Sequence, residues 1–307
     1  IEGLDLAFAT EEKNISMLEA RKSWIDNMSD LQVTCRVITL RERIPPDEII
    51  GTFDNPLLEQ VAYTWQSTLN RVYSNSHYVV ISIPDRPDAL KDLNYASQTL
   101  MATLSEYGVR AMFESEDSLP KDSPFHVFSR ICSPVSKPDP KVRNAEGAML
   151  NEILTADHIH FTGENGIIKF FSGDQEMYAI TMGLRTSGDF MDESMIVSLL
   201  AIDCELTMLH NIKPIFKPNA RALLLQQANM ARMTSFSGDV IDQYNEALSS
   251  IEDSDANYQA LTEYAMTLVL KGHSLEEIDF AEGEVQRICR LFGVTPVREG
   301  WVSQASF

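Results

Sequence analysis

The sequence predicts an α+β fold made by tandem duplication of a ferredoxin-like split βαβ unit, with a helical arm inserted between the two central strands of each copy. The stretch Leu90–Glu114, LKDLNYASQTLMATLSEYGVRAMFE, aligns without a gap with Leu275–Glu299, LEEIDFAEGEVQRICRLFGVTPVRE. Identical Leu, Ala, Gly, Val and Glu residues recur along this match. A strand-like alternation of apolar and polar residues precedes each stretch, in Ser29–Arg43 and in Asp203–Ile215. We expect a first ferredoxin-like α+β subdomain at 1–114, a Pro-rich connector at 115–152, and a β-hairpin plus the second such subdomain, with a longer arm, at 153–307.

Both copies follow one order of elements, which is strand, helix, strand, arm, strand, helix and short strand. In the first copy these are Leu4–Ala9, Glu11–Met28, Ser29–Arg43, Pro56–Tyr73, Tyr78–Ile83, Leu90–Tyr107 and Val109–Phe113. In the second copy they are Tyr178–Leu184, Met191–Ile202, Asp203–Ile215, Pro218–Ser250, Tyr264–Leu270, Leu275–Phe292 and Val294–Arg298.

The two matched helices each carry one apolar face, which we expect to lie on a sheet. Gly108 and Gly293 stand where each helix stops, a position that favours a left-handed residue. Pro296 lacks a backbone donor, so the last short strand belongs at a sheet edge. The apolar faces consist of Leu90, Leu93, Ala96, Leu100, Leu104 and Tyr107 in the first helix and Leu275, Ile278, Ala281, Val285, Cys289 and Phe292 in the second.

Between the copies, Ser115–Gly147 is rich in Pro, Ser, Asp and Lys and is predicted to be an irregular connector. Asn165–Gly166 then separates two apolar runs, which is a strong hairpin signal. We interpret this segment as a hairpin that joins the second sheet.

The arms carry the candidate interface. Asn55 and Pro56 suit the start of a helix, and the second arm is predicted to be two helices broken near Ser237–Gly238. The apolar stripes of the arms have two interpretations, internal packing or a partner surface. The candidate interface residues are Leu224, Leu225, Met230, Met233, Phe236 and Trp65.

Composition excludes several classes of protein. The 307 residues include 45 acidic and 25 basic side chains, a net charge of −20, which disfavours direct binding to nucleic acid. The four cysteines are widely spaced, which argues against a disulfide framework and fits a reducing cytosol. No apolar run is long enough to span a bilayer. The abrupt start and end of the sequence suggest a fragment of a longer protein.

Motifs for catalysis are missing from the sequence. No phosphate-binding loop G-x-x-x-x-G-K-[ST] occurs, so we expect no catalytic, cofactor-binding or metal-binding residues and no efficient ATP binding in this part. Ser118–Lys121 matches S-x-x-K but lies in the connector rather than at a helix start. His158 and His160 on the hairpin are the best metal candidates, with Glu164 across the turn, but a solvent-facing pair is favoured. His210 is interpreted as a core histidine with a partner.

Three segments resemble the N-terminal region of the CagE/TrbE/VirB transport ATPases of bacterial type IV secretion and conjugation systems. They are IEGLDLAF at the start, FKPNARALLLQQANMARM in the second arm, and GHSLEEIDFAEGEVQRICRLFGVTPVREGWVSQASF at the end, which is the closest of them. In that family the last block leads to the motor domain. None of the three segments is catalytic.

The resemblance implies that this part is a non-catalytic assembly and docking domain of an ATPase that powers substrate transfer and pilus biogenesis. It further implies inner-membrane secretion proteins and other copies of the chain as partners, a hexamer at full length, and a cytoplasmic location peripheral to the inner membrane. ATP and Mg would bind in a motor domain beyond residue 307. Two alternatives are a stand-alone duplicated ferredoxin-like binding module and a metal-dependent enzyme that uses the hairpin histidines.

Overall fold

The computed structural model describes residues 10–44, 55–68, 72–112, 123–137, 149, 154–163, 165–186, 193–233, 238–252 and 261–300. The helices within these ranges are α1 (Glu11–Asp30), α3 (Pro56–Thr68), α4 (Ala89–Thr103), α5 (Pro124–Cys132), α7 (Glu193–Leu200), α8 (Lys217–Met233), α9 (Gly238–Glu252) and α10 (Leu275–Leu291). The strands are β1 (Thr34–Arg43), β2 (Tyr73–Ser82), β3 (His158–Phe161), β4 (Ile167–Ser172), β5 (Gln175–Thr186), β6 (Glu205–Pro214), β7 (Thr262–Gly272) and β8 (Thr295–Arg298).

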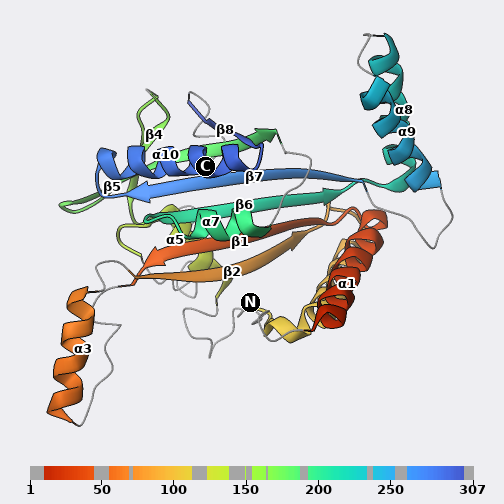
Figure 1. Cartoon of the computed structure of the whole chain (residues 1–307). Coiled ribbons are helices and arrows are strands. Elements are labelled where there is room, and N and C mark those ends of the chain that lie inside the picture. Colours follow the sequence, from red (N-terminus) through yellow and green to blue (C-terminus); the bar gives the residue numbers. More distant parts are fainter. Residues whose placement is uncertain are drawn as a thin grey trace. The chain divides into compact units, whose positions relative to one another are not determined.

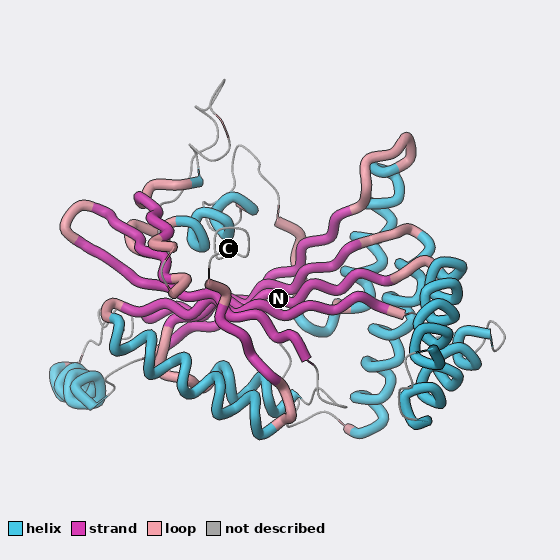
Figure 2. Tube along the Cα trace, turned by 90° about the horizontal axis from the view of Figure 1, so that it is seen from above, coloured by secondary structure: helices cyan, strands magenta, loops and turns pink. Residues whose placement is uncertain are grey.

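The protein is α+β with an antiparallel sheet of eight strands. The strand order is β2-β1-β6-β7-β5-β4-β3, and β8 also pairs with β5. Long β5 accommodates two neighbours on one side, because β4 pairs with its first half and β8 with its second half. Figures 1 and 2 show these strands side by side. The sequence predicts a separate sheet for the second copy, and this expectation is wrong, since β1 and β2 join the same sheet through β6.

The chain divides into two compact units, and four strands contribute residues to both. The first unit contains 1–37, 78–111 and 210–265, and the second contains 38–77, 112–209 and 266–307. The division therefore falls inside β1, β2, β6 and β7.

In the second unit, α7 and α10 cover one face of the sheet. Met195 and Leu199 of α7 and Ile278, Ala281 and Val285 of α10 pack against buried side chains of β5, β6 and β7. The opposite face holds a smaller cluster of Ile168, Phe170, Met177, Ala179 and Val269, with Val135 packed against it.

In the first unit, α1 and α4 pack together over the strand segments of that unit. Trp24 and Met28 of α1 and Ala96 of α4 are buried with Val33 and Cys35. The indole Nε1 of Trp24 donates a hydrogen bond to the carbonyl oxygen of Ala96 at 3.4 Å.

Several predicted local features are present. The matched helices end at glycines with positive φ, 62° at Gly108 and 68° at Gly293. The hairpin forms as predicted, with β3 and β4 antiparallel, and Asn165 and Gly166 both have positive φ. A Cβ on Gly166 would collide with the backbone oxygen of Glu299, so glycine is required there for two independent reasons.

Other predictions are wrong. The first arm helix ends at Thr68 and Tyr73 already belongs to β2, because this segment pairs with β1, next to the hydrogen bond that the backbone N–H of Ile44 donates to the carbonyl oxygen of Val72 at 2.9 Å. Residues 109–112 form no strand, although their counterparts form β8 on β5. The strand that would pair with them, Leu4–Ala9, lies outside the described residues.

The connector also contains more structure than its composition predicts, because α5 forms within it. Ser123 caps this helix by accepting a hydrogen bond from the backbone N–H of Phe125, and Pro124 occupies the first position. At the matched helices, Leu90 and Leu275 are exposed instead of facing the sheet. Each stands in the first turn of its helix, where the apolar face is not covered.

Candidate functional site

The second arm is a pair of helices, α8 and α9, that pack side by side (Figure 1). Its small core contains Ala220 and Leu224 from α8 and Leu248 from α9, with Tyr244 and Ala247 packed against them. Leu224, a predicted interface residue, is only 3% exposed and lies inside this core. The side chain of Arg232 donates to the side-chain oxygen of Asn245 at 3.1 Å, which also links the two helices.

The outer face of α8 exposes the remaining described candidates. Leu225 is 38% exposed, Met230 is half-exposed and Met233 is 84% exposed. The helix KPNARALLLQQANMARM also contains Lys217, Arg221 and Arg232 but no acidic residue, in a chain with a net charge of −20. The exposed side chains described on α8 thus include apolar ones and two basic ones, Arg221 and Arg232. Phe236 lies outside the described residues.

In the described part of the first arm, the helix is α3, which lies between β1 and β2 in the chain (Figure 1). Asn55 begins it as predicted, since its side-chain oxygen accepts a hydrogen bond from the backbone N–H of Leu57 at 2.9 Å. The large apolar side chains described on α3 are exposed rather than packed, namely Leu57, Leu58, Val61 and Tyr63. The side chain of the remaining candidate, Trp65, lies outside the description.

A cluster of charged side chains lies partly buried within the second unit. The carboxylate of Glu42 accepts hydrogen bonds from Nε of Arg130 at 3.0 Å and from Nη2 at 3.0 Å. Nζ of Lys137 lies 3.6 Å from Glu42 and 3.4 Å from Glu205. Oε1 of Glu205 also accepts the backbone N–H of Arg43 at 2.9 Å. Burial alone raises the pKa of Glu42, but its hydrogen bonds with Arg130 and the positive charges of Arg130 and Lys137 hold that pKa below its usual value.

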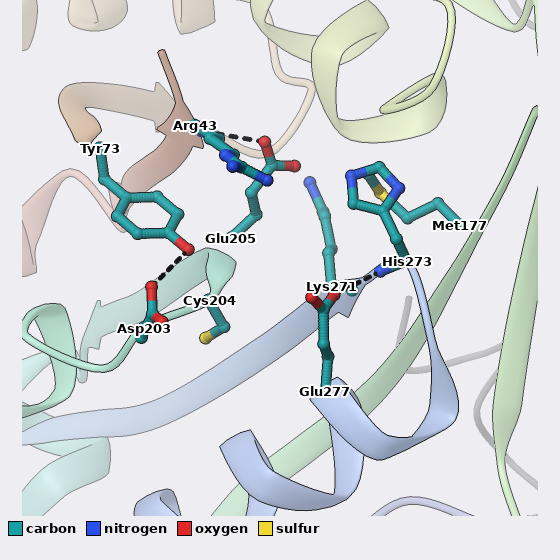
Figure 3. A pocket seen from close by; sticks show the side chains of 10 residues that line it. Arg43, Tyr73, Met177, Asp203, Cys204, Glu205, Lys271, His273 and Glu277 are labelled. Carbon is teal, nitrogen blue, oxygen red and sulfur yellow. Dashed lines mark hydrogen bonds between the residues drawn. The ribbon is translucent and has the colours of Figure 1, made fainter. Parts of the chain in front are cut away.

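Lys271 completes this ionic cluster, which we define as Glu42, Arg130, Lys137, Glu205 and Lys271. Its side chain is 5% exposed and extends from β7 toward Glu205 and His273 (Figure 3). Burial lowers the pKa of Lys271, and the negative charges of Glu205 and Glu42 oppose that effect. Among the described residues, the structure gives this ammonium group no hydrogen bond or ion pair.

A cavity of about 20 Å³ lies beside this ammonium group, room for about one water molecule. Around it, the hydroxyl of Tyr73 donates to Asp203 at 2.9 Å and the backbone N–H of His273 donates to Glu277 at 2.8 Å (Figure 3). Burial raises the pKa of Cys204 to about 12, so its thiol stays protonated at neutral pH. Tyr73 and Asp203 thus satisfy each other's hydrogen-bonding groups, as do His273 and Glu277. These pairs support a structural role for the residues that line the cavity. The cavity is lined by Arg43, Tyr73, Met177, Asp203, Cys204, Glu205, Lys271, Gly272, His273 and Glu277.

The hairpin histidines are exposed, and among the described residues, which do not include Glu164, neither joins a metal-binding group. His158 and His160 point to the same side of β3 and are open to solvent. In the described ranges, no group of three or more His, Cys, Asp or Glu residues could hold a metal ion. His210 has a partner, as predicted, because its Nδ1 lies 2.7 Å from the hydroxyl of Tyr264.

The ionic cluster was not predicted from the sequence. Its members come from β1, α5, the turn after α5, β6 and β7, so no local spacing reveals it. One signal was present, since Lys271 ends the apolar run MTLVLK, where a lysine is expected to be buried and in need of nearby carboxylates.

Taken together, these features define an α+β protein whose helical arms expose apolar side chains and whose ionic cluster links side chains from β1, α5, β6 and β7. Over residues 128–307, more than half of the chain, it matches the model of the CagE, TrbE, VirB family, a component of the type IV transporter system. The chain therefore belongs to this family of type IV secretion ATPases, which confirms the resemblance noted in the sequence. No curated protein matches the chain. No helix in the described ranges is both long enough and apolar enough to cross a bilayer.

Proposed function

We propose that this chain is the non-catalytic assembly and docking region of a type IV secretion ATPase. Its arms contact inner-membrane components of the transporter and neighbouring subunits, at the cytoplasmic side of the membrane. ATP and Mg bind in a motor domain beyond residue 307, and the full-length protein assembles as a hexamer. Membership of the family supports this proposal.

The observation that carries the proposal is the exposed apolar surface of the arms. Single exposed apolar residues are common on any protein, but Leu225, Met230 and Met233 lie on one outer face of α8. Each side chain contributes about 1.5–3 kcal/mol when fully buried, so a partner that covers this face gains enough to hold an assembly together.

The proposal includes the duplication, in which the two copies are related βαβ units that each present one arm. In the second copy, the order β8-β5-β7-β6 is the order of a ferredoxin-like unit. Matched positions also behave alike in the two copies. Ala96 and Ala281 are fully buried, whereas Tyr95 and Phe280 are exposed.

The proposal is tested with a pair of variants of the full-length protein in cells that carry the transporter. Met233→Asp places a charge on the outer face of α8, and Leu224→Asp places one inside the arm. We expect Met233→Asp to keep the melting temperature within about 2 °C of wild type and to reduce cross-linking to the inner-membrane components at least 5-fold. Leu224→Asp should instead destabilise the arm. Undiminished cross-linking of a folded Met233→Asp protein would contradict the docking role of this face.

A further inference from the structure

The first arm helix, α3, exposes apolar side chains on a helix that is too short to be stable alone. Helices of 13 residues are marginal in water without packing, and α3 has that length. Its side chains Leu57, Leu58 and Val61 form one stripe, because residues three and four apart share a helix face. None of them is buried. The stripe therefore lacks a cover among the described residues.

The second arm indicates the kind of cover that suits such a helix. There α8 is covered by a second helix, α9, which buries Leu224 against Leu248. Each arm follows a helix and a strand and precedes a strand and a helix, but α3 has no second helix in its insertion among the described residues. A second copy of the chain can supply to α3 the kind of cover that α9 supplies to α8.

The charge of α3 indicates which kind of partner can cover its apolar stripe. From Asn55 to Thr68 the only side chain that is charged at neutral pH is Glu59, in a chain with a net charge of −20. A surface without cations has no attraction for anionic lipids or for acidic partners. Two copies of the chain repel each other over most of their surface, and α3 is a nearly uncharged place where they can touch. An apolar stripe is also complementary to itself under two-fold symmetry.

We propose that α3 pairs with α3 of a second copy as an antiparallel two-fold helix pair that crosses near Val61. This inference rests on the proposed assembly role of the arms and names the partner of the first arm. In this arrangement the two copies of Glu59 lie on either side of the crossing. A contact of one helix, about 20 Å long, is smaller than the roughly 1,200 Å² typical of stable complexes, so the isolated pair associates reversibly in the micromolar range.

Cysteine cross-linking tests the pairing with a matched control. Val61 and Tyr63 are both 59% exposed, but they lie on opposite sides of the helix. In an antiparallel two-fold pair, a cysteine at the crossing meets its own copy. Val61→Cys should therefore form disulfide-linked dimers under mild oxidation at least 10-fold faster than Tyr63→Cys. The unmodified chain measures the background from its own cysteines, of which Cys35, Cys204 and Cys289 are buried.

Sedimentation equilibrium supplies the second measurement. The unmodified chain should dimerise reversibly, Val61→Asp should weaken dimerisation at least 10-fold, and Tyr63→Asp should leave it within 3-fold. Circular dichroism checks that the variants are folded. Equal cross-linking rates of the two cysteine variants, or a chain that stays monomeric at all concentrations, would overturn the pairing. The docking role of α8 is tested separately, by the cross-linking of Met233→Asp to the inner-membrane components. A result that contradicts the α3 pairing therefore leaves the docking proposal intact.

Discussion

Two substitutions in the ionic cluster should differ in their effect on stability, because three cations in it face two carboxylates. Glu42→Gln removes the charge that Arg130 contacts through two nitrogens and leaves three cations with Glu205 alone. Breaking a buried ion pair costs about 3–5 kcal/mol, whereas a surface pair contributes about 0–1 kcal/mol. The side chains of Glu42 and Arg130 are about one quarter exposed, so we expect a loss of about 2–3 kcal/mol.

Lys271→Met should have a small or favourable effect. The substitution removes a buried ammonium group, to which the described residues offer no hydrogen bond, and leaves two cations with two carboxylates. Methionine is similar in length and fills the same space. We expect a free energy of unfolding within about 1 kcal/mol of wild type, or above it, since replacing a buried charge with an apolar group is often neutral or stabilising.

Urea unfolding at pH 7, followed by circular dichroism, measures both effects. The double variant sharpens the comparison, because Glu42→Gln in a Lys271→Met background leaves two cations and one carboxylate. Its loss should be smaller than the loss in the wild-type background by about 1 kcal/mol. A Lys271→Met protein that loses as much stability as Glu42→Gln would show that the ammonium group is paired, and the charge count would then be wrong.

Two further predictions concern the second unit. Gly166→Ala should reduce the free energy of unfolding by about 2 kcal/mol or more, because it adds a collision with the Glu299 backbone to the strain of a positive φ. Gly173 has a similar φ but open space around it, so Gly173→Ala should cost only about 1 kcal/mol in the same urea titration. For Cys204, the folded pKa of about 12 lies above the unfolded value of 9.0, so the unfolded chain releases the proton first. Its contribution to stability is complete below pH 9 and is lost as pH rises toward 12, by about 1 kcal/mol per pH unit. Melting temperatures between pH 8 and 11 should fall less steeply in Cys204→Ala, and parallel curves would refute the assignment.

Local signals in the sequence determined several elements because they depend only on neighbouring residues. The hairpin at Asn165–Gly166 required two residues with positive φ, and the sequence places the two residue types that tolerate it there. The helix start at Asn55 and the helix ends at Gly108 and Gly293 also depend only on neighbouring residues, since Asn55 caps a nearby backbone N–H and glycine tolerates a positive φ. The family resemblance was likewise present in the sequence, since it rests on linear motifs.

Only the tertiary structure decided how strands from both halves of the chain share one sheet and which side chains meet across it. Strand pairing brings Glu42, Glu205 and Lys271 together from distant segments, and no pattern of local spacing encodes that proximity. The second arm is a further example, because packing against α9 buries some apolar residues of α8 and leaves others exposed. Leu224 is covered by α9 while its neighbour Leu225 faces outward, because a helix turns by about 100° per residue and only one side of it can meet its partner.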